Sequence, residues 1–201
     1  MYIPKLYLEE DREQIIAFMK QYSFATIVTV KDNFPTATHL PFIIQEKGDQ
    51  LVLTAHFARA NDQWKQILDN QILVIFSEPH AYISPRHYEK EQNVPTWNYI
   101  SVHAYGKGRI IDSDAESFAA LEQMIITYEE EYKVQWDRLP DTYKQKMLKG
   151  IVAFEITVTD LQAKKKLSQN KTDIEREQII DALSKSDLTV EKEIARYMSE
   201  S

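Results

Sequence analysis

Short strand-like segments joined by turns constrain the fold of this chain more than any other feature. Between residues 24 and 57, the segments "FATIVTV", "TATHLPFII" and "LVLTAHF" alternate or are rich in β-branched residues. The stretches between them, "KDNF" (31–34) and "EKGDQ" (46–50), have the length and composition of turns. Parallel strands need crossover connections of a dozen or more residues. The pattern therefore predicts an antiparallel meander and excludes a series of βαβ units.

Further strand and helix patterns fill the first 160 residues. Strands are expected at 71–76, 80–84, 96–111 and 151–160, with a bulge or bend at Gly106 and Gly108. Helices are expected at 9–22, at 61–70 and at 141–149, with Asn70 ending the second. A long helix is also expected to begin at Ser113 and to bury one stripe of apolar side chains. The stripe comprises Phe118, Leu121, Ile125, Tyr128 and Tyr132. Many antiparallel strands with few helices predict an α+β barrel with peripheral helices.

The composition changes after residue 160. Lys164–Lys166 and Lys171 form a basic cluster, interpreted as a solvated turn or a phosphate contact, and helical patterns follow at 173–184 and 189–198. We place a barrel domain at 1–160 and a basic turn with a helical extension at 161–201. The helical pair has a helix–turn–helix outline, but residues 172–201 contain four Lys and Arg against eight Asp and Glu. That charge argues against DNA reading and favours a hairpin that packs on the barrel or on a partner chain.

Composition excludes several classes of protein. The chain has no cysteine, so disulfides and thiolate chemistry are absent. Its net charge of −7 opposes nucleic acid binding except through a local basic face. The longest apolar run is "ILVIF" (72–76), whereas a membrane span needs about 20 residues, and no signal peptide is visible. We expect a cytoplasmic protein without membrane contact.

The segment "ARAND" (58–62) is a candidate phosphate seat. Arg59 follows a strand, and Asn61 is placed to cap a helix, whose free N–H groups and partial positive charge favour anions. An arginine adds donors that match phosphate. The competing interpretation is that Arg59 pairs with Asp62 and that Asn61 is only a cap. Spacing leaves both open.

Histidines and aromatic residues occupy strand positions. All five histidines lie between residues 39 and 103, without helical metal-ligand spacing, so we interpret them as hydrogen-bonded polar positions and expect no metal site. No catalytic residue is assigned, because nucleophile elbows and glycine-rich phosphate loops are missing. In "VPTWNYISVHAYG" (94–106), the face with Ile100, Val102 and Ala104 is the expected core. The opposite face, with Trp97, Tyr99, His103 and Tyr105, is expected at an interface.

Several stretches resemble the PaiB family, described as FMN-binding negative transcriptional regulators. They are "MYIP" (1–4), "HLPF" (39–42), "AHFARANDQW" (55–64), "PHAYISP" (79–85), "VPTWNY" with "VHAYG" (94–106), and "KLSQN" (166–170). The resemblance implies a split β-barrel of the pyridoxamine-phosphate-oxidase type, a homodimer, and FMN in a groove between subunits.

The same resemblance implies which residues hold the cofactor. Arg59, Ala60 and Asn61 would hold the phosphate. Two strand segments would line the ring and ribityl chain: Thr38, His39 and Leu40, and Thr54, Ala55 and His56. Trp97 and Tyr99 would close the site from the other subunit.

Repression of protease synthesis and sporulation genes is the implied role, with promoter DNA or another regulatory protein as partner. The alternative is a flavin-dependent oxidoreductase or flavin reductase, with His39, His56 and Tyr99 as candidate proton donors. A third option is haem or metal binding through the strand histidines.

Overall fold

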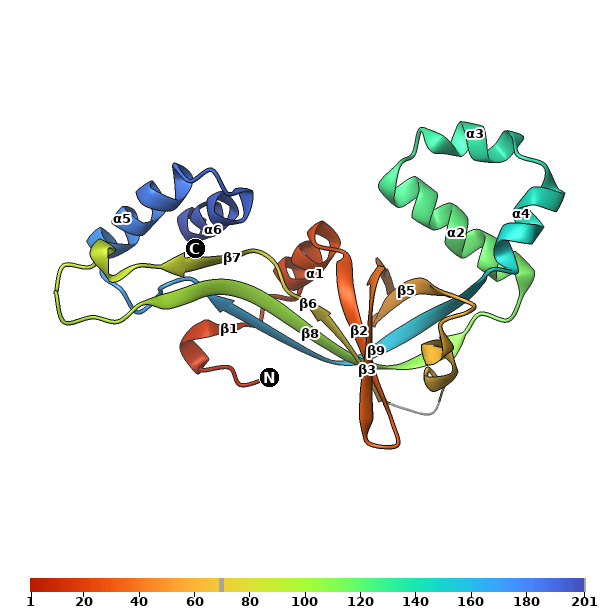
Figure 1. Ribbon diagram of the computed structural model, residues 1–201, viewed down its shortest axis with the longest axis horizontal. Coiled ribbons are helices and arrows are strands. Elements are labelled where there is room, and N and C mark those ends of the chain that lie inside the picture. The colour runs from red at the N-terminus through yellow and green to blue at the C-terminus, as the bar shows by residue number, and fades with distance from the viewer. Residues whose placement is uncertain (69–70, 201) are drawn as a thin grey trace. The chain divides into compact units, whose positions relative to one another are not determined.

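The computed structural model describes residues 1–68 and 71–200, which form two compact units. The terminal unit comprises Met1–Ile15, Ser77–His103 and Gln162–Ser201, and the central unit comprises Ile16–Phe76 and Ala104–Leu161. Two long strands, β8 (Thr96–Ile110) and β9 (Ile151–Lys166), contribute residues to both units (Figure 1). The expected boundary at residues 160 and 161 lies inside β9.

The central unit is built on an antiparallel sheet with the order β3-β2-β6-β8-β9-β5-β4. The strands not yet given are β2 (Phe24–Lys31), β3 (Phe34–Pro41), β4 (Ile43–Lys47), β5 (Gln50–Ala58) and β6 (Gln71–Phe76). Asp32 and Asn33 join β2 to β3 with positive φ angles of 53° and 62°. Such two-residue turns match the twist of a β-hairpin, so the turn chemistry explains the local pairing. The predicted antiparallel pairing and α+β class are confirmed, but the strand expected at 36–44 is divided into β3 and β4, which lie at opposite ends of the strand order.

One face of the central sheet forms an apolar core. Side chains alternate along a strand, so Leu53, Ala55 and Phe57 of β5 enter the core together. Phe57 stacks on Phe154 of β9 with ring centroids 4.9 Å apart. Thr54 and His56 point to the opposite face of β5.

The two glycines of β8 serve close packing inside an unbroken strand. A Cβ atom on Gly106 would lie 2.4 Å from the carbonyl oxygen of Thr157 in β9. At Gly108 it would lie 2.4 Å from Cγ2 of Ile67. No side chain fits at either position, because contacts this short are strongly repulsive.

The helices of the central unit differ from the expectation in three places. The predicted helix at 61–70 is a five-residue 3-10 helix, η2 (Asp62–Gln66), and Asn70 lies outside the described residues. The expected buried stripe is wrong, because no residue of α2 (Asp114–Tyr128) is buried and Tyr128 is 50% exposed. The sequence also gave no separate prediction for α3 (Tyr132–Arg138), which lies between α2 and α4 (Asp141–Leu148).

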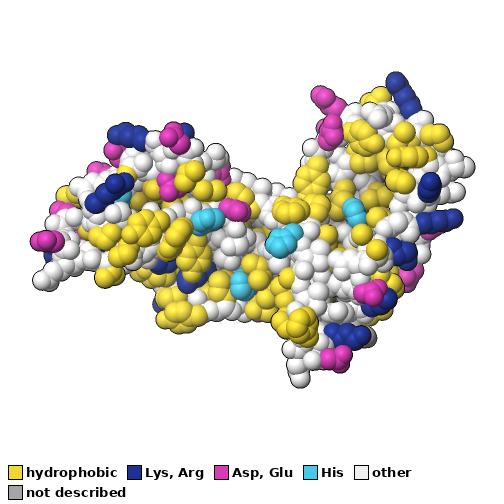
Figure 2. Space-filling view, in the orientation of Figure 1, with side chains coloured by type: hydrophobic (Ala, Val, Ile, Leu, Met, Phe, Trp, Pro, Cys, Tyr) yellow, Lys and Arg dark blue, Asp and Glu magenta, His cyan; other side chains and the backbone are white. Residues whose placement is uncertain are grey.

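Hydrophobic side chains remain on the surface over these three helices (Figure 2). They include Ile126, Tyr128, Val134, Tyr143 and Met147. The helical periodicity of apolar residues therefore identifies the apolar side of α2 but does not show whether another element buries that side.

The terminal unit combines short strands with two C-terminal helices. The chain begins with η1 (Lys5–Tyr7) and β1 (Leu8–Glu9), which leads into α1 (Arg12–Gln21); β1 pairs with the end of β9. Strand β7 (His80–Ile83) precedes η3 (Pro85–His87) and pairs with the start of β8. Helices α5 (Asp173–Ser184) and α6 (Thr189–Ser199) pack against each other, and α6 also contacts β7 (Figure 1).

The predicted helical pair after residue 172 is confirmed, and Thr172 with Glu175 forms a capping box at the start of α5. The expected basic turn is wrong, because Lys164–Lys166 lie in β9. Within the described residues, no helix has both the length and the apolar character needed to cross a bilayer.

Candidate functional site

Arg59, at the end of β5, is held by backbone carbonyl groups. Its Nε donates to the carbonyl oxygen of Lys149 at 2.9 Å, and its Nη2 donates to that of Ile151 at 2.7 Å. Asp62 does not pair with Arg59, because its carboxylate binds Lys65 at 2.5 Å. A guanidinium has five N–H donors, so these two bonds fix its orientation and leave capacity for an anion. Arg59 is exposed and is therefore accessible to one.

The helix contribution to the predicted phosphate seat is wrong. A macrodipole builds up over several aligned turns, and η2 has only five residues in 3-10 geometry. The donors at this position are instead side chains, namely Arg59 and the amide of Asn61.

Asn61 and Thr38 meet in a cluster of hydrogen bonds centred on Gln63. Nδ2 of Asn61 donates to Oγ1 of Thr38 at 3.0 Å, and Oδ1 of Asn61 accepts from the backbone N–H of Gln63 at 3.1 Å. The Thr38 hydroxyl in turn donates to Oε1 of Gln63 at 2.5 Å. Thr38, predicted in a strand, and Asn61, predicted as a helix cap, are thus in direct contact.

Gln63 anchors this cluster to the sheet and was not predicted. Its side chain is 2% exposed, and its Nε2 donates to the carbonyl oxygen of Thr36 at 3.0 Å and to Oγ1 of Thr29 at 3.1 Å. Buried amides need such partners. Helical spacing at 61–70 marks only the apolar positions, so no signal in the sequence distinguishes Gln63 from an exposed glutamine.

Thr54 lies beside a cavity of about 360 Å³ in the central unit. Its side chain is 5% exposed, and its hydroxyl is a buried group with no hydrogen-bond partner among the described residues. In the register, Thr54 lies between Ile43 of β4 and Glu155 of β9, both of which also line the cavity. An orphaned hydroxyl in a cavity wall is a position where a bound polar group would gain a hydrogen bond.

A chain of ion pairs crosses the same cavity wall. Glu155 binds Lys47 at 2.7 Å and Arg109 at 2.8 Å, and Arg109 also binds Glu116 of α2 at 3.1 Å. Although its partial burial raises the pKa of Glu155, the hydrogen bonds and charges of Lys47 and Arg109 outweigh this and lower it overall. The four charges compensate one another, and none was singled out from the sequence.

The remaining predicted residues of the central unit take different positions. His56 is half-buried, and desolvation lowers its pKa. His39 is exposed and stacks on Phe24 with ring centroids 6.3 Å apart. Leu40 is half-buried and Ala60 exposed, whereas the side chain of Ala55 lies in the core, so only its backbone faces a possible ligand.

Trp97 and Tyr99 belong to the terminal unit, where they lie on one face of β8. The Trp97 indole is 52% exposed and contacts Tyr82 at 5.8 Å and His80 at 6.0 Å between ring centroids. The opposite face is buried, as predicted, because Ile100, Val102 and Ala104 are all in the core.

The histidines do not converge on a metal. In the part of the chain that the structure describes, no three His, Cys, Asp or Glu side chains are arranged to hold a metal ion.

Comparison with known proteins defines the class of this protein. Residues 1–160 match a family described as "Putative FMN-binding domain". The fold is similar to the flavocytochrome Anf3 from Azotobacter vinelandii, with a TM-score of 0.66 and 17% identity over 82% of this chain and 72% of that one. It is also similar to the FAD and haem binding protein from Mycobacterium smegmatis, with a TM-score of 0.61 and 16% identity over 80% and 73% of the two chains. The class is therefore that of the FMN-binding split barrels, and the cofactor is FMN.

Relatives identify the family within this class. The "Protease synthase and sporulation protein PAI 2" of Bacillus subtilis is 40% identical over 203 residues, which cover 100% of this chain and 97% of that protein. An uncharacterized protein of Emericella nidulans is 29% identical, covering 82% and 81% of the two chains. The chain belongs to the PaiB family of FMN-binding proteins.

The residues present fit such a cofactor. The oriented guanidinium of Arg59 and the Asn61 amide suit a phosphate group. The orphaned hydroxyl of Thr54 suits a polar group of the flavin or its ribityl chain.

Proposed function

We propose that this protein is a homodimeric, FMN-binding negative regulator of transcription. The observation that carries the proposal is the fixed guanidinium of Arg59 at the end of β5, two residues before Asn61, which hydrogen-bonds to Thr38. Because these donors are already held in place, binding an anion does not incur the entropy cost of ordering long side chains. The proposal is further supported by the relative whose name refers to protease synthesis and sporulation.

In this proposal each predicted segment has a task toward FMN. The phosphate binds to Arg59, to the backbone at Ala60 and to Asn61. The isoalloxazine and the ribityl chain lie along β3 and β5, against the residues Thr38, His39, Leu40, Thr54, Ala55 and His56, with Ala55 contributing its backbone only. Trp97 and Tyr99 are supplied by the second copy of the chain.

Bound FMN supplies a redox-active ring, and the protein residues determine how it is held. The regulatory step is a change in the dimer surface that follows binding or reduction of the flavin. Because the net charge is −7 and residues 172–201 have an excess of acidic groups, a protein partner is a more favourable target than DNA. Gel-shift titration with promoter DNA at low salt, with and without FMN, distinguishes the two routes.

Replacing Arg59 tests the phosphate seat directly. We expect Arg59→Ala to weaken FMN binding by about 10- to 100-fold, because charge-assisted hydrogen bonds contribute about 1.5–3 kcal/mol. Arg59→Lys should recover only part of the affinity, since an ammonium lacks the planar fork. Flavin fluorescence quenching measures the affinity, and circular dichroism checks that each variant is folded.

Arg138→Ala is the matched control, because Arg138 is also exposed and lies at the end of α3. If Arg59→Ala binds FMN within twofold of the wild type while folded, the phosphate is not at this arginine.

Flavin-dependent oxidoreduction is the second candidate function, and His56 favours it. Desolvation lowers the pKa of this histidine, so a neutral imidazole is present at pH 7 on the same face of β5 as Thr54. Such an imidazole accepts a proton during flavin chemistry. Steady-state oxidation of NADH or NADPH with FMN is the test. Turnover no faster than that of free flavin counts against an enzyme, and turnover lost in His56→Gln supports it.

A further inference from the structure

Lys164 of β9 is a buried cation without a carboxylate partner. Lys164 is 8% exposed, and among the described residues no Asp or Glu forms an ion pair with its ammonium group. Its Nζ makes a 3.4 Å hydrogen bond to the carbonyl oxygen of Tyr2 and lies 5.1 Å and 5.9 Å from the ring centroids of Tyr99 and Tyr2. An ammonium has three N–H donors, so these contacts compensate its lost hydration only in part.

Lys166 adds a second cation on the same face of the strand. Positions two apart point to the same side, and about 6.6 Å separates their Cα atoms. The Nζ of Lys166 donates to the Thr96 hydroxyl and, at 2.8 Å, to the carbonyl oxygen of Trp97. Burial and the nearby charge of Lys164 both lower the pKa of Lys166. Neutral oxygen atoms therefore hold two repelling ammonium groups.

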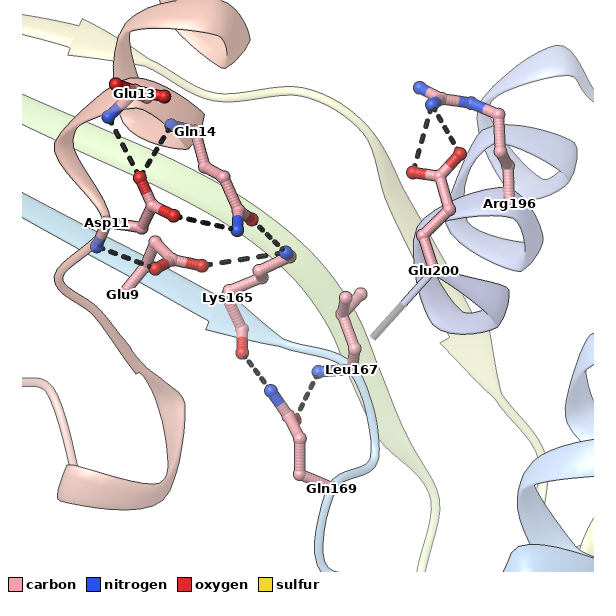
Figure 3. Close-up of polar contacts among 9 residues, drawn as sticks. All are labelled: Glu9, Asp11, Glu13, Gln14, Lys165, Leu167, Gln169, Arg196 and Glu200. Carbon is pink, nitrogen blue, oxygen red and sulfur yellow. Dashed lines mark hydrogen bonds and ion pairs between the residues drawn. The ribbon is translucent and has the colours of Figure 1, made fainter.

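Lys165, between them, shows the ordinary arrangement (Figure 3). It points to the other face of β9, where it pairs with Glu9 at 3.5 Å and donates to Gln14 at 3.1 Å. Strand alternation thus splits the run of three lysines into one compensated cation and two uncompensated ones. Packing alone does not account for the difference, because an apolar side chain at position 164 would avoid the cost of burying the charge.

We propose that Lys164 and Lys166 form an anion site in the terminal unit that binds a phosphate dianion. Two ammonium groups match the charge of a phosphate or phosphate monoester, and lysine is a common phosphate ligand. Lys166 binds the backbone carbonyl of Trp97, whose exposed indole contacts the exposed ring of Tyr82, and these rings suit a planar ring attached to that phosphate. The ligand class is therefore inorganic phosphate or a nucleoside monophosphate.

This site uses none of the residues proposed for the FMN phosphate. Arg59, Ala60 and Asn61 belong to the central unit, and all residues of the lysine site belong to the terminal unit. The two proposals are therefore separable by mutation at Arg59, Lys164 and Lys166, but not at Trp97 or Tyr99, which are also proposed to close the FMN site.

Thermal unfolding in phosphate, compared with chloride at matched ionic strength, tests the site. For the wild type we expect 20 mM phosphate to raise Tm by about 2–4 °C, because ligand that binds only the native state stabilises it. Lys164→Met keeps the aliphatic stem, so the variant should have an equal or higher Tm without phosphate and no response to it. Lys166→Met should lose the response as well.

Lys165→Met is the matched control and should keep the phosphate response. Arg59→Ala should also keep it, which separates this site from the FMN site. Isothermal titration with AMP and with inorganic phosphate distinguishes the sources: tighter binding of AMP identifies a nucleotide site, and equal binding identifies phosphate alone. A wild-type Tm that is the same in phosphate and chloride overturns the proposal. Equal loss of response in Lys165→Met also overturns it.

Discussion

Replacing Gln63 with leucine tests whether a buried amide holds the candidate cofactor site together. The substitution keeps the approximate size of the side chain and removes its polar atoms. Four hydrogen bonds of the Gln63 side chain, to Thr38, Ile27, Thr36 and Thr29, are lost. Thr29 still has Gln66 as a partner at 2.7 Å, but the carbonyl of Thr36 loses a bond at a partly buried position.

The magnitude follows from these contacts. Each neutral hydrogen bond contributes about 1 kcal/mol net, and an orphaned buried group costs about 1–3 kcal/mol. Leucine regains part of this by burying apolar surface, about 1 kcal/mol here. We therefore expect Gln63→Leu to lower the free energy of unfolding by about 2–4 kcal/mol.

Urea unfolding followed by tryptophan fluorescence measures this loss, and the chain has three tryptophans as probes. FMN affinity should fall in parallel, because Thr38 and Asn61 lose the side chain that positions them. Gln135→Leu is the control at an exposed position of α3, where the expected change is within about 0.5 kcal/mol. A Gln63→Leu variant with a loss below about 1 kcal/mol and unchanged FMN binding would refute the role of Gln63 as anchor.

Two further predictions concern packing and pH. Gly106→Ala should cost about 2–4 kcal/mol in unfolding free energy by urea denaturation, because its Cβ would lie 2.4 Å from the Thr157 carbonyl oxygen. Gly150→Ala, where the nearest atom is 3.3 Å away, should cost clearly less; equal losses would contradict the argument. Desolvation lowers the pKa of His56 in the folded state. In the unfolded chain this histidine has an ordinary pKa of about 6.5, so as the pH falls below that value the unfolded state binds more protons than the folded state. Stability should therefore fall from pH 7 to pH 5, and His56→Gln should flatten this slope; an unchanged slope in urea unfolding would show that His56 is not the cause.

The apolar surface over α2–α4 shows that the periodicity of apolar residues predicts a helix but not its burial. The three-four spacing from Phe118 to Tyr128 correctly predicts a helix, because apolar residues at that spacing share one side, but the expected continuation to Tyr132 is wrong because Tyr132 begins α3. It does not determine how deeply that side is buried, since burial depends on the element packed against it. The exposed Tyr128 nevertheless uses its hydroxyl in two hydrogen bonds: it donates to the Phe42 carbonyl oxygen at 3.0 Å and accepts from the Ser23 hydroxyl at 2.8 Å.

The candidate site likewise contains some residues that could be predicted from the sequence and others that could not. The sequence pattern placed Arg59 and Asn61 at the end of a strand, and their donor chemistry is local. It predicted a helix dipole beside them, which the five-residue η2 does not supply. Gln63 and the Glu155 ion pairs were missed, because their partners lie 25 to 108 positions away in the chain. The assignment to FMN came from the family resemblance and not from spacing.

The sequence by itself determined most of the strand segments, that neighbouring ones pair antiparallel, and which face of β8 is apolar; it missed β1, the division between β3 and β4, and the end of β9 beyond residue 160. Alternation and turn chemistry depend only on residues near each other in the chain, so they can be predicted from the amino-acid sequence alone. Tertiary structure alone decided which polar groups meet: Thr38 meets Asn61 and Gln63, whereas among the residues that the structure describes Thr54 has no hydrogen-bond partner and Lys164 lacks a carboxylate like the one that pairs with Lys165. The physical reason is that a charge or hydroxyl is satisfied by whatever the folded chain brings within about 3 Å.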